Sequence, residues 1–262
     1  MGQLNGKVAL VTGSSRSIGK AIAIALAKEG ASLVLAARNV EGLNATAKAI
    51  KTLGRDVEVV PTDVKSEQQI DNLFKRTMER FGRLDILVNN AGVFDGGPID
   101  KITTEDWDNV ITTNLRAPFL CTRAAFAIMK AQGGGRIINI GSISASRVRQ
   151  NNAPYSSAKF GLVGLTHTTA LEGREFNITC GILHPAMSNV ILSSPLALAL
   201  LKSRGCHRRK LRLPPFIWPA SLLMSMSWKL SSFPKTSYIW EGDRIAVVGV
   251  VSRDNYVLLP SR

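Results

Sequence analysis

The sequence predicts an α/β protein with one doubly wound parallel sheet, a Rossmann fold of three α/β/α layers in a single domain. Three observations carry this prediction. Short aliphatic or β-branched runs alternate six times with longer amphipathic stretches between residues 1 and 185. The runs are short and nearly all apolar, as strands covered on both faces must be. The first run leads through a Gly- and Ser-rich turn directly into a helical pattern, which is typical of a phosphate-binding crossover.

The predicted strands are Lys7–Thr12, Ser32–Ala37, Val57–Thr62, Leu84–Asn89, Arg136–Ile140 and Ile178–Leu183. Apolar residues recur at helical spacing between them, for example in the predicted helix Ile18–Glu29. Crossovers between parallel strands are right-handed. The ligand site of such a sheet lies at the carboxyl ends of the strands, where the strand order reverses.

Length and composition exclude several other classes of protein. The 262 residues are 45% hydrophobic and 20% charged, which excludes a disordered, collagenous or coiled-coil chain. No apolar run approaches the roughly 20 residues of a membrane helix, and no targeting signal is read at the N-terminus, so we expect a soluble cytoplasmic protein. The three cysteines form no CxxC pair, and the sequence therefore indicates neither a disulfide framework nor a metal site.

The turn from Thr12 to Gly19 joins the first predicted strand to the first predicted helix and contains three Ser and two Gly. Small residues let the backbone approach a pyrophosphate, and the free N–H groups of a helix N-terminus favour negative charge. A Gly-rich turn alone is also compatible with an ordinary helix entry. Strand, turn and helix together favour a dinucleotide-binding site.

The residues after the second predicted strand indicate which dinucleotide is bound. An acidic residue there would bind the ribose hydroxyls of NAD, whereas this chain has Arg38. A second cation, Arg16, lies within the turn. Because arginine forms bidentate, charge-assisted hydrogen bonds with phosphate, the pair predicts NADP(H) with its 2′-phosphate. Two solvated surface arginines are the alternative interpretation.

Tyr155 and Lys159 are four residues apart, on one face of a predicted helix. A neighbouring cation lowers the pKa of a phenol from about 10, which makes the hydroxyl a usable proton donor or acceptor near neutrality. Ser142 follows the fifth predicted strand, where its hydroxyl could bind the same substrate oxygen. A surface helix pair is the alternative, and the convergence of Ser142, the turn and Asn90 at one sheet edge argues against it.

Five separated motifs, in this order and spacing, resemble the short-chain dehydrogenase/reductase family over about residues 4 to 185. They are Thr12-Gly13-xxx-Ser17-Ile18-Gly19, Asn89-Asn90-Ala91-Gly92, Asn114, Ser142 and Tyr155-xxx-Lys159. The chain is most similar in these motifs to NADP-dependent carbonyl reductases and 3-oxoacyl-thioester reductases. The resemblance implies a Rossmann-type dinucleotide-binding and catalytic domain over residues 1–185.

The resemblance also implies a role for each catalytic position. Tyr155 would protonate the carbonyl oxygen as hydride arrives, and Lys159 would lower the pKa of Tyr155 and bind the nicotinamide ribose. Ser142 would hold the carbonyl, and Asn114 would anchor a water that connects Lys159 to solvent. The cofactor-binding residues would be Gly13, Ser15, Arg16, Ser17, Ile18, Gly19, Arg38, Asp63, Val64, Asn90, Ala91, Gly92, Tyr155, Lys159 and Pro185.

The chain departs from the family pattern at two positions of this site. Ser17 stands where the family usually has Gly, which is tolerated if φ at that position is negative. Pro185-Ala186 replaces the usual Pro-Gly beside the nicotinamide. The resemblance also implies two long helices, over Thr103–Gln132 and Ala153–Gly173, through which family members assemble. We therefore expect a homo-oligomer, either a dimer or a tetramer.

Residues 186–262 have a different composition from the rest of the chain. They carry 11 Lys and Arg against 3 Asp and Glu, so their net charge is +8 of the +14 of the whole chain. They also contain three of the four Trp but only three of the 22 Gly. This stretch is therefore predicted to be an atypical basic tail, which replaces the substrate lid and last strand of the family.

The genetic code provides a hypothesis for this tail. In a reading frame that takes the third base of each codon with the first two of the next, Trp218-Pro219 must give Ala, Trp228-Lys229 must give Glu and Trp240-Glu241 must give Gly. The remaining positions allow a family-like helix and last strand. We hypothesise a frameshift between Ala186 and Cys206, which would lower stability and activity relative to an in-frame parent.

The sequence therefore predicts an NADP-dependent short-chain oxidoreductase that reduces a small-molecule carbonyl, namely a ketone, an aldehyde or a 3-oxoacyl thioester. The alternative is a non-catalytic or poorly folded product that retains only the cofactor fold. A third interpretation, a nucleic-acid binder driven by the basic tail, is disfavoured because the five basic residues of Arg204 to Arg212 form no recognisable module. We expect neither nucleic acid nor a membrane as a partner.

Overall fold

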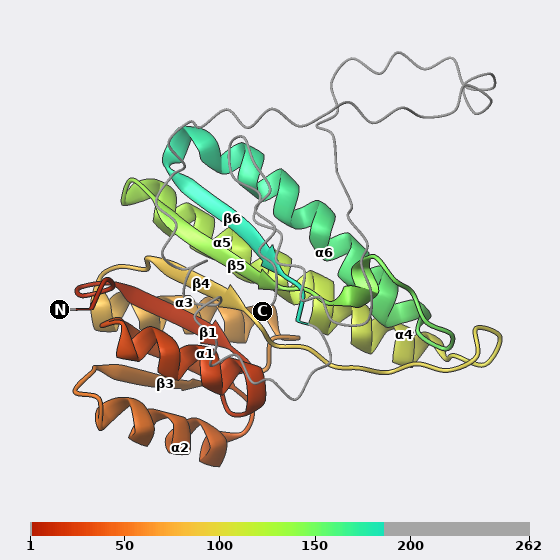
Figure 1. Cartoon of the computed structure of the whole chain (residues 1–262), viewed down its shortest axis with the longest axis horizontal. Helices are drawn as coiled ribbons and strands as arrows, with labels where there is room; N and C mark the ends of the chain where they lie inside the picture. Colours follow the sequence, from red (N-terminus) through yellow and green to blue (C-terminus); the bar gives the residue numbers. More distant parts are fainter. Residues whose placement is uncertain (1, 186–262) are drawn as a thin grey trace, which may run out of the picture.

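Parallel pairing of six strands sets the architecture of the chain (Figure 1). The structure is a computed structural model that describes residues 2–185, and the predictions for the basic tail and its reading frame lie outside the described residues. The strands follow one another across the sheet in the order β3-β2-β1-β4-β5-β6. They are β1 (Val8–Thr12), β2 (Ser32–Ala37), β3 (Val57–Pro61), β4 (Ile86–Asn89), β5 (Gly135–Ile140) and β6 (Ile178–Leu183).

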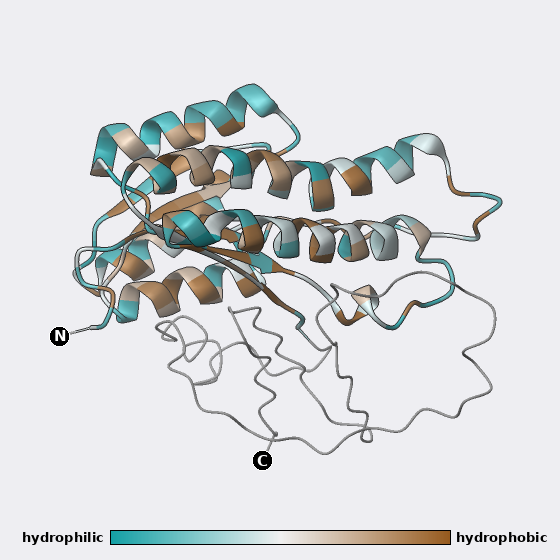
Figure 2. Ribbon diagram, turned by 90° about the horizontal axis from the view of Figure 1, so that it is seen from above, coloured by the Kyte–Doolittle hydropathy of each residue, from teal (hydrophilic) through white to brown (hydrophobic). Residues whose placement is uncertain are grey.

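Helices cover both faces of this sheet (Figures 1 and 2). α1 and α2 pack on one face, around a core that includes Leu26, Leu33 and Leu43. α3 and α5 pack on the other face, around Leu73 and Met129, and α6 lies against β6. The helices are α1 (Ser17–Lys28), α2 (Val40–Lys51), α3 (Glu67–Phe81), α4 (Thr104–Ile111), α5 (Ala117–Ala131) and α6 (Ala153–Glu172).

The predicted fold class is confirmed. β2 and β6 have the predicted bounds, and the ends of the other strands differ from the prediction by at most two residues. β1 and β4 are buried along their whole length, as expected for central strands covered on both faces. The strand order reverses between β1 and β4, so the crevice that binds ligands in such folds opens at their carboxyl ends.

One predicted helix is divided. The chain from Thr103 to Gln132 forms α4 and α5, separated by a π-helical turn over Thr112–Arg116. Pro118 lacks the N–H that an α-helix would donate to the carbonyl of Asn114, four residues earlier. The side chain of Asn114 meanwhile binds the backbone of Val93. The helix therefore widens at Asn114, as π-turns at functional sites commonly do.

No helix among residues 2–185 is both long enough and apolar enough to cross a membrane.

Candidate active site

The turn between β1 and α1 has the shape of a phosphate-binding loop. Gly13 has a φ of +66°, and a Cβ at this position would lie 2.8 Å from Nδ2 of Asn90. A Cβ on Gly19 would lie 2.5 Å from the same nitrogen, so both positions require glycine. Arg16 is the N-cap of α1 and makes no side-chain capping hydrogen bond. The helix end therefore has N–H groups without a side-chain cap, which fits the pyrophosphate of a dinucleotide.

Thr12 and Asn90 join the turn to the end of β4. The hydroxyl of Thr12 accepts hydrogen bonds from the backbone N–H groups of Asn90 and Ala91, each at 3.0 Å. Nδ2 of Asn90 donates to the carbonyl oxygens of Thr12 at 2.9 Å and Gly13 at 3.2 Å. The sharp turns after β1 and β4 are thus held together at the point where the strand order reverses.

Two arginines lie on the β2 side of the turn. Arg16 and Arg38 are exposed, and neither forms an ion pair with a described residue. The side chain of Asn39 accepts a hydrogen bond from the N–H of Gly42 at 2.7 Å and so caps α2. The hydroxyl of Thr46, on α2, donates to the carbonyl of Ser14 at 3.1 Å. The start of α2 is therefore fixed against the turn, with both guanidinium groups available to a phosphate.

Asp63 and Val64 follow β3 at the same edge of the sheet. A carboxylate oxygen of Asp63 accepts a hydrogen bond from the N–H of Lys65 at 3.0 Å. The backbone N–H of Asp63 donates to the side chain of Gln69 at 2.8 Å. Val64 is buried. These bonds fix the loop that is predicted to border the adenine.

Asn114 is completely buried in the π-turn and holds the chain that leaves β4. Its Oδ1 accepts from the N–H of Val93 at 2.9 Å, and its Nδ2 donates to the carbonyl of Val93 at 2.7 Å. Both polar atoms of the side chain are therefore engaged. The predicted water contact of Asn114 stays a prediction.

Lys159 is the buried cation of the site and is 5% exposed. Its Nζ donates to the carbonyl oxygen of Ile140, at the end of β5, at 2.7 Å. The same nitrogen lies 5.6 Å from the centre of the Tyr155 ring. Burial lowers the pKa of Lys159 to about 8. The ammonium is thus still the main form at neutral pH, held beside the phenol.

Phe94 lies against Tyr155 from the β4 side. The centres of the two rings are 5.2 Å apart, and the rings meet edge to face at 62°. Phe94 directly follows Val93, which Asn114 holds in place. Tyr155 thus lies close to both a cation and an aromatic ring.

Ser142 lies two residues beyond Ile140, the residue to which Lys159 is bound. Its Oγ accepts a hydrogen bond from the N–H of Ser144 at 3.1 Å. Its backbone contacts the side chain of His184, whose Nδ1 lies 2.7 Å from the carbonyl oxygen of Ser142. The hydroxyl proton of Ser142 therefore remains available for a substrate oxygen.

The predicted site residues gather at the carboxyl edge of the sheet. Each of the six strands is followed by at least one of these residues. Asn114, Tyr155 and Lys159 instead lie on helical elements and reach the edge from there. The structure adds Phe94 and His184, which sequence reasoning missed. The sequence places both residues next to predicted site residues. Phe94 lies two residues after the Asn-Asn-Ala-Gly motif, and His184 directly precedes Pro185.

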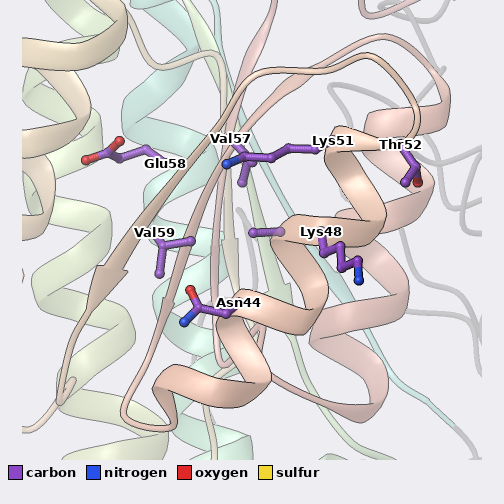
Figure 3. Close-up of a pocket in the computed structure, with 8 residues that line it drawn as sticks. Asn44, Lys48, Lys51, Thr52, Val57, Glu58 and Val59 are labelled. Carbon is purple, nitrogen blue, oxygen red and sulfur yellow. The ribbon is translucent and has the colours of Figure 1, made fainter.

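A cleft visible in the structure lies elsewhere. It opens between α2 and β3, at the far end of the sheet from α6, and it contains none of the predicted site residues (Figure 3). It is lined by Asn44, Ala47, Lys48, Lys51, Thr52, Val57, Glu58 and Val59. The predicted active site at the carboxyl edge therefore does not include this cleft.

Comparison with known proteins agrees with this geometry. A family model described as short chain dehydrogenase matches residues 7–197. A 3-oxoacyl-[acyl-carrier-protein] reductase of Synechocystis sp. is 39% identical over 71% of this chain and 75% of the relative. A 3beta-hydroxysteroid dehydrogenase of Mediterraneibacter gnavus is 32% identical over 86% of this chain and 81% of the relative.

A solved structure gives the same result. A metagenomic short-chain oxidoreductase in complex with NADP is 38% identical, with a TM-score of 0.71, over 76% of this chain and 91% of that chain. The likeness therefore extends from sequence to fold.

Ser17 is a strained residue in the phosphate-binding turn. Its φ is +47°, whereas a residue other than glycine would be tolerated at this position only with a negative φ. An L-residue in this left-handed region costs about 1–2 kcal/mol, because its Cβ approaches the following carbonyl oxygen. The side chain of Ser17 accordingly carries a conformational cost that glycine would not have.

We predict that Ser17→Gly raises the melting temperature by about 2 to 4 °C, because relief of the strain adds on the order of 1 kcal/mol to the free energy of unfolding. Thermal unfolding followed by circular dichroism measures the change. Ser146→Gly is the matched control, because Ser146 is exposed with a φ of −137° and should gain nothing. An unchanged or lower melting temperature for Ser17→Gly would contradict the assignment of strain.

Proposed function

The chain belongs to the short-chain dehydrogenase family, and we propose that it reduces a ketone, an aldehyde or a 3-oxoacyl thioester to the alcohol, with NADPH as the hydride donor. Membership makes the protein an oxidoreductase, and the family uses nicotinamide cofactors. The observation that carries the finer proposal is the placement of Lys159. Its Nζ binds the carbonyl of Ile140 at the end of β5, two residues before Ser142, and lies 5.6 Å from the centre of the Tyr155 ring.

Tyr155 is the proton donor of the proposed reaction. When bound, NADPH would supply the hydride for the carbonyl carbon. Tyr155 would donate its phenolic proton to the carbonyl oxygen. Lys159 stabilises the resulting phenolate, because its ammonium is close to the ring and shielded from water. The hydroxyl of Ser142 donates to the same oxygen and orients it, since Ser144 already occupies one lone pair of Oγ.

The chain offers the groups that a bound dinucleotide needs. The uncapped end of α1 would hold the pyrophosphate, and Lys159 would contact the nicotinamide ribose. Arg16 and Arg38 would hold the 2′-phosphate, which favours NADPH over NADH. The NADP of the metagenomic relative supports this preference, and the 3-oxoacyl reductase relative supports the thioester among the possible substrates.

We also propose that the protein is a homo-oligomer. Phe119 on α5 is 46% exposed, and Phe160 on α6 is 47% exposed. These aromatic side chains lie on the two helices through which the sequence predicts assembly. We expect light scattering to give the mass of a dimer or tetramer, and a stable, active monomer would overturn the proposal.

We predict that Tyr155→Phe abolishes carbonyl reduction and leaves NADPH binding nearly intact, because only the proton donor is removed. Turnover of a ketone and an oxoacyl-thioester panel, followed by NADPH oxidation, measures the first effect. NADPH fluorescence titration measures the second. If the variant retains more than about a tenth of wild-type turnover, an effect below ~1.4 kcal/mol, Tyr155 is not the acid.

We predict that Arg38→Ala lowers kcat/KM with NADPH by about tenfold or more and changes kcat/KM with NADH little, because a charge-assisted hydrogen bond to the 2′-phosphate is lost. Steady-state kinetics with both cofactors test this. Arg174→Ala is the matched control, since Arg174 is exposed in the turn between α6 and β6, at the opposite edge of the sheet. A wild-type preference for NADH, or an equal loss with both cofactors, would contradict the assignment.

A further inference from the structure

The main-chain ladder between β5 and β6 ends just before Ser142. The N–H of Gly141 donates to the carbonyl of Leu183 at 2.6 Å, which is the last backbone hydrogen bond of this pair. In a regular parallel ladder the next donor would be the N–H of Pro185, and proline has none. The backbone of β6 therefore cannot hold the chain at Ser142.

At this point the side chain of His184, and not the backbone of β6, contacts the backbone of Ser142. Its Nδ1 lies 2.7 Å from the carbonyl oxygen of Ser142 and 3.1 Å from the backbone nitrogen of the same residue. One ring nitrogen cannot donate and accept at once. The shorter contact joins two atoms that would repel without a proton between them, so Nδ1 carries the hydrogen and donates to the Ser142 carbonyl.

The imidazole fits this position because residue 141 is glycine. A Cβ on Gly141 would lie 2.6 Å from Nδ1 and 2.8 Å from Cε1 of His184. Burial lowers the pKa of His184, and the Lys159 ammonium lowers it as well, while the hydrogen bond to Ser142 acts in the opposite direction. The ring is thus neutral near pH 7, with its single proton on the nitrogen that faces Ser142.

We propose that His184 is a positioning residue that fixes Ser142 for catalysis. Its Nδ1–H holds the Ser142 carbonyl, the N–H of Ser144 holds the Ser142 Oγ, and together they direct the remaining hydroxyl proton toward the substrate oxygen. The inference rests on the proposed function, because Ser142 needs a carbonyl substrate in order to act.

The first test compares substitutions at position 184. We expect His184→Ala to lower kcat about tenfold and to leave the Kd for NADPH within about threefold of wild type, since one hydrogen bond next to Ser142 is lost. His184→Asn should recover most of kcat, because its amide nitrogen can take the place of Nδ1. His167→Ala, a half-buried histidine on α6 outside the site, is the matched control and should keep wild-type kcat. Wild-type kcat in His184→Ala would overturn the proposal.

The second test asks whether His184 acts through Ser142. In a Ser142→Ala background, His184→Ala should lower kcat by less than about twofold, because the group that it positions is absent. An equal loss in both backgrounds would show that His184 acts independently of Ser142 and would overturn the proposal. Should His184→Ala not fold, His184→Leu, which fills the space beside Gly141 without a donor, takes its place in both tests.

The third test does not depend on activity. Nitrogen-15 NMR of the histidine rings, with the His184 signals assigned by their loss in His184→Asn, should show the Nδ1–H tautomer near neutral pH. An Nε2–H tautomer would overturn the inference. Absence of any carbonyl reduction by the wild-type protein would overturn the proposed function, whereas an active wild type with an equally active His184→Ala variant would overturn only the role of His184.

Discussion

The hydrogen bonds between Thr12 and Asn90 are the interaction on which the site depends. They join β1 and β4, the two strands between which the order of the sheet reverses. They also bring the turn between β1 and α1 against the segment that leads to the proposed catalytic residues. Glycine at positions 13 and 19 follows from this join, because a Cβ at either position would collide with Asn90. A parallel sheet brings all strand ends to one edge, but it does not set the distance between two neighbouring turns. The side-chain amide of Asn90 sets that distance by donating to two carbonyl oxygens, those of Thr12 and Gly13.

The half of the site that we propose to be catalytic is held from the interior of the protein. Asn114 binds Val93, Val93 precedes Phe94, and Phe94 packs on Tyr155, so a side chain buried in the π-turn determines one wall of the phenol. Lys159 binds the end of β5, and its Nζ lies 5.6 Å from the centre of the Tyr155 ring. Each of these contacts joins elements that are distant in the sequence. A preorganised arrangement of this kind lets the hydroxyl groups act on a substrate oxygen with little reorganisation, because their supporting bonds are already formed.

The sequence predicted most of the fold, because buried parallel strands are short apolar runs whose ends are marked by turn residues. It also predicted which residue types meet at the sheet edge, since strand ends converge in any doubly wound fold. It did not predict features that depend on contacts across the chain. At the break between α4 and α5, Asn114 binds Val93 in addition to the local effect of Pro118, and the proposed role of His184 rests on a contact with Ser142, 42 residues earlier. The positive φ of Ser17 was left open for the same reason, because local sequence does not reveal how tightly the turn is closed.

Lys159 shows how stability and reactivity oppose each other in this site. Burial lowers its pKa to about 8, and no ion pair with a carboxylate among residues 2–185 offsets the loss of hydration. A buried, unpaired cation costs free energy that a well-packed apolar residue would not. The single hydrogen bond to the Ile140 carbonyl recovers only part of that cost. A carboxylate partner would stabilise the ammonium, but it would also cancel the positive potential at Tyr155. Among residues 2–185, the charge of Lys159 therefore lies beside the ring of Tyr155, whose hydroxyl we propose as the proton donor.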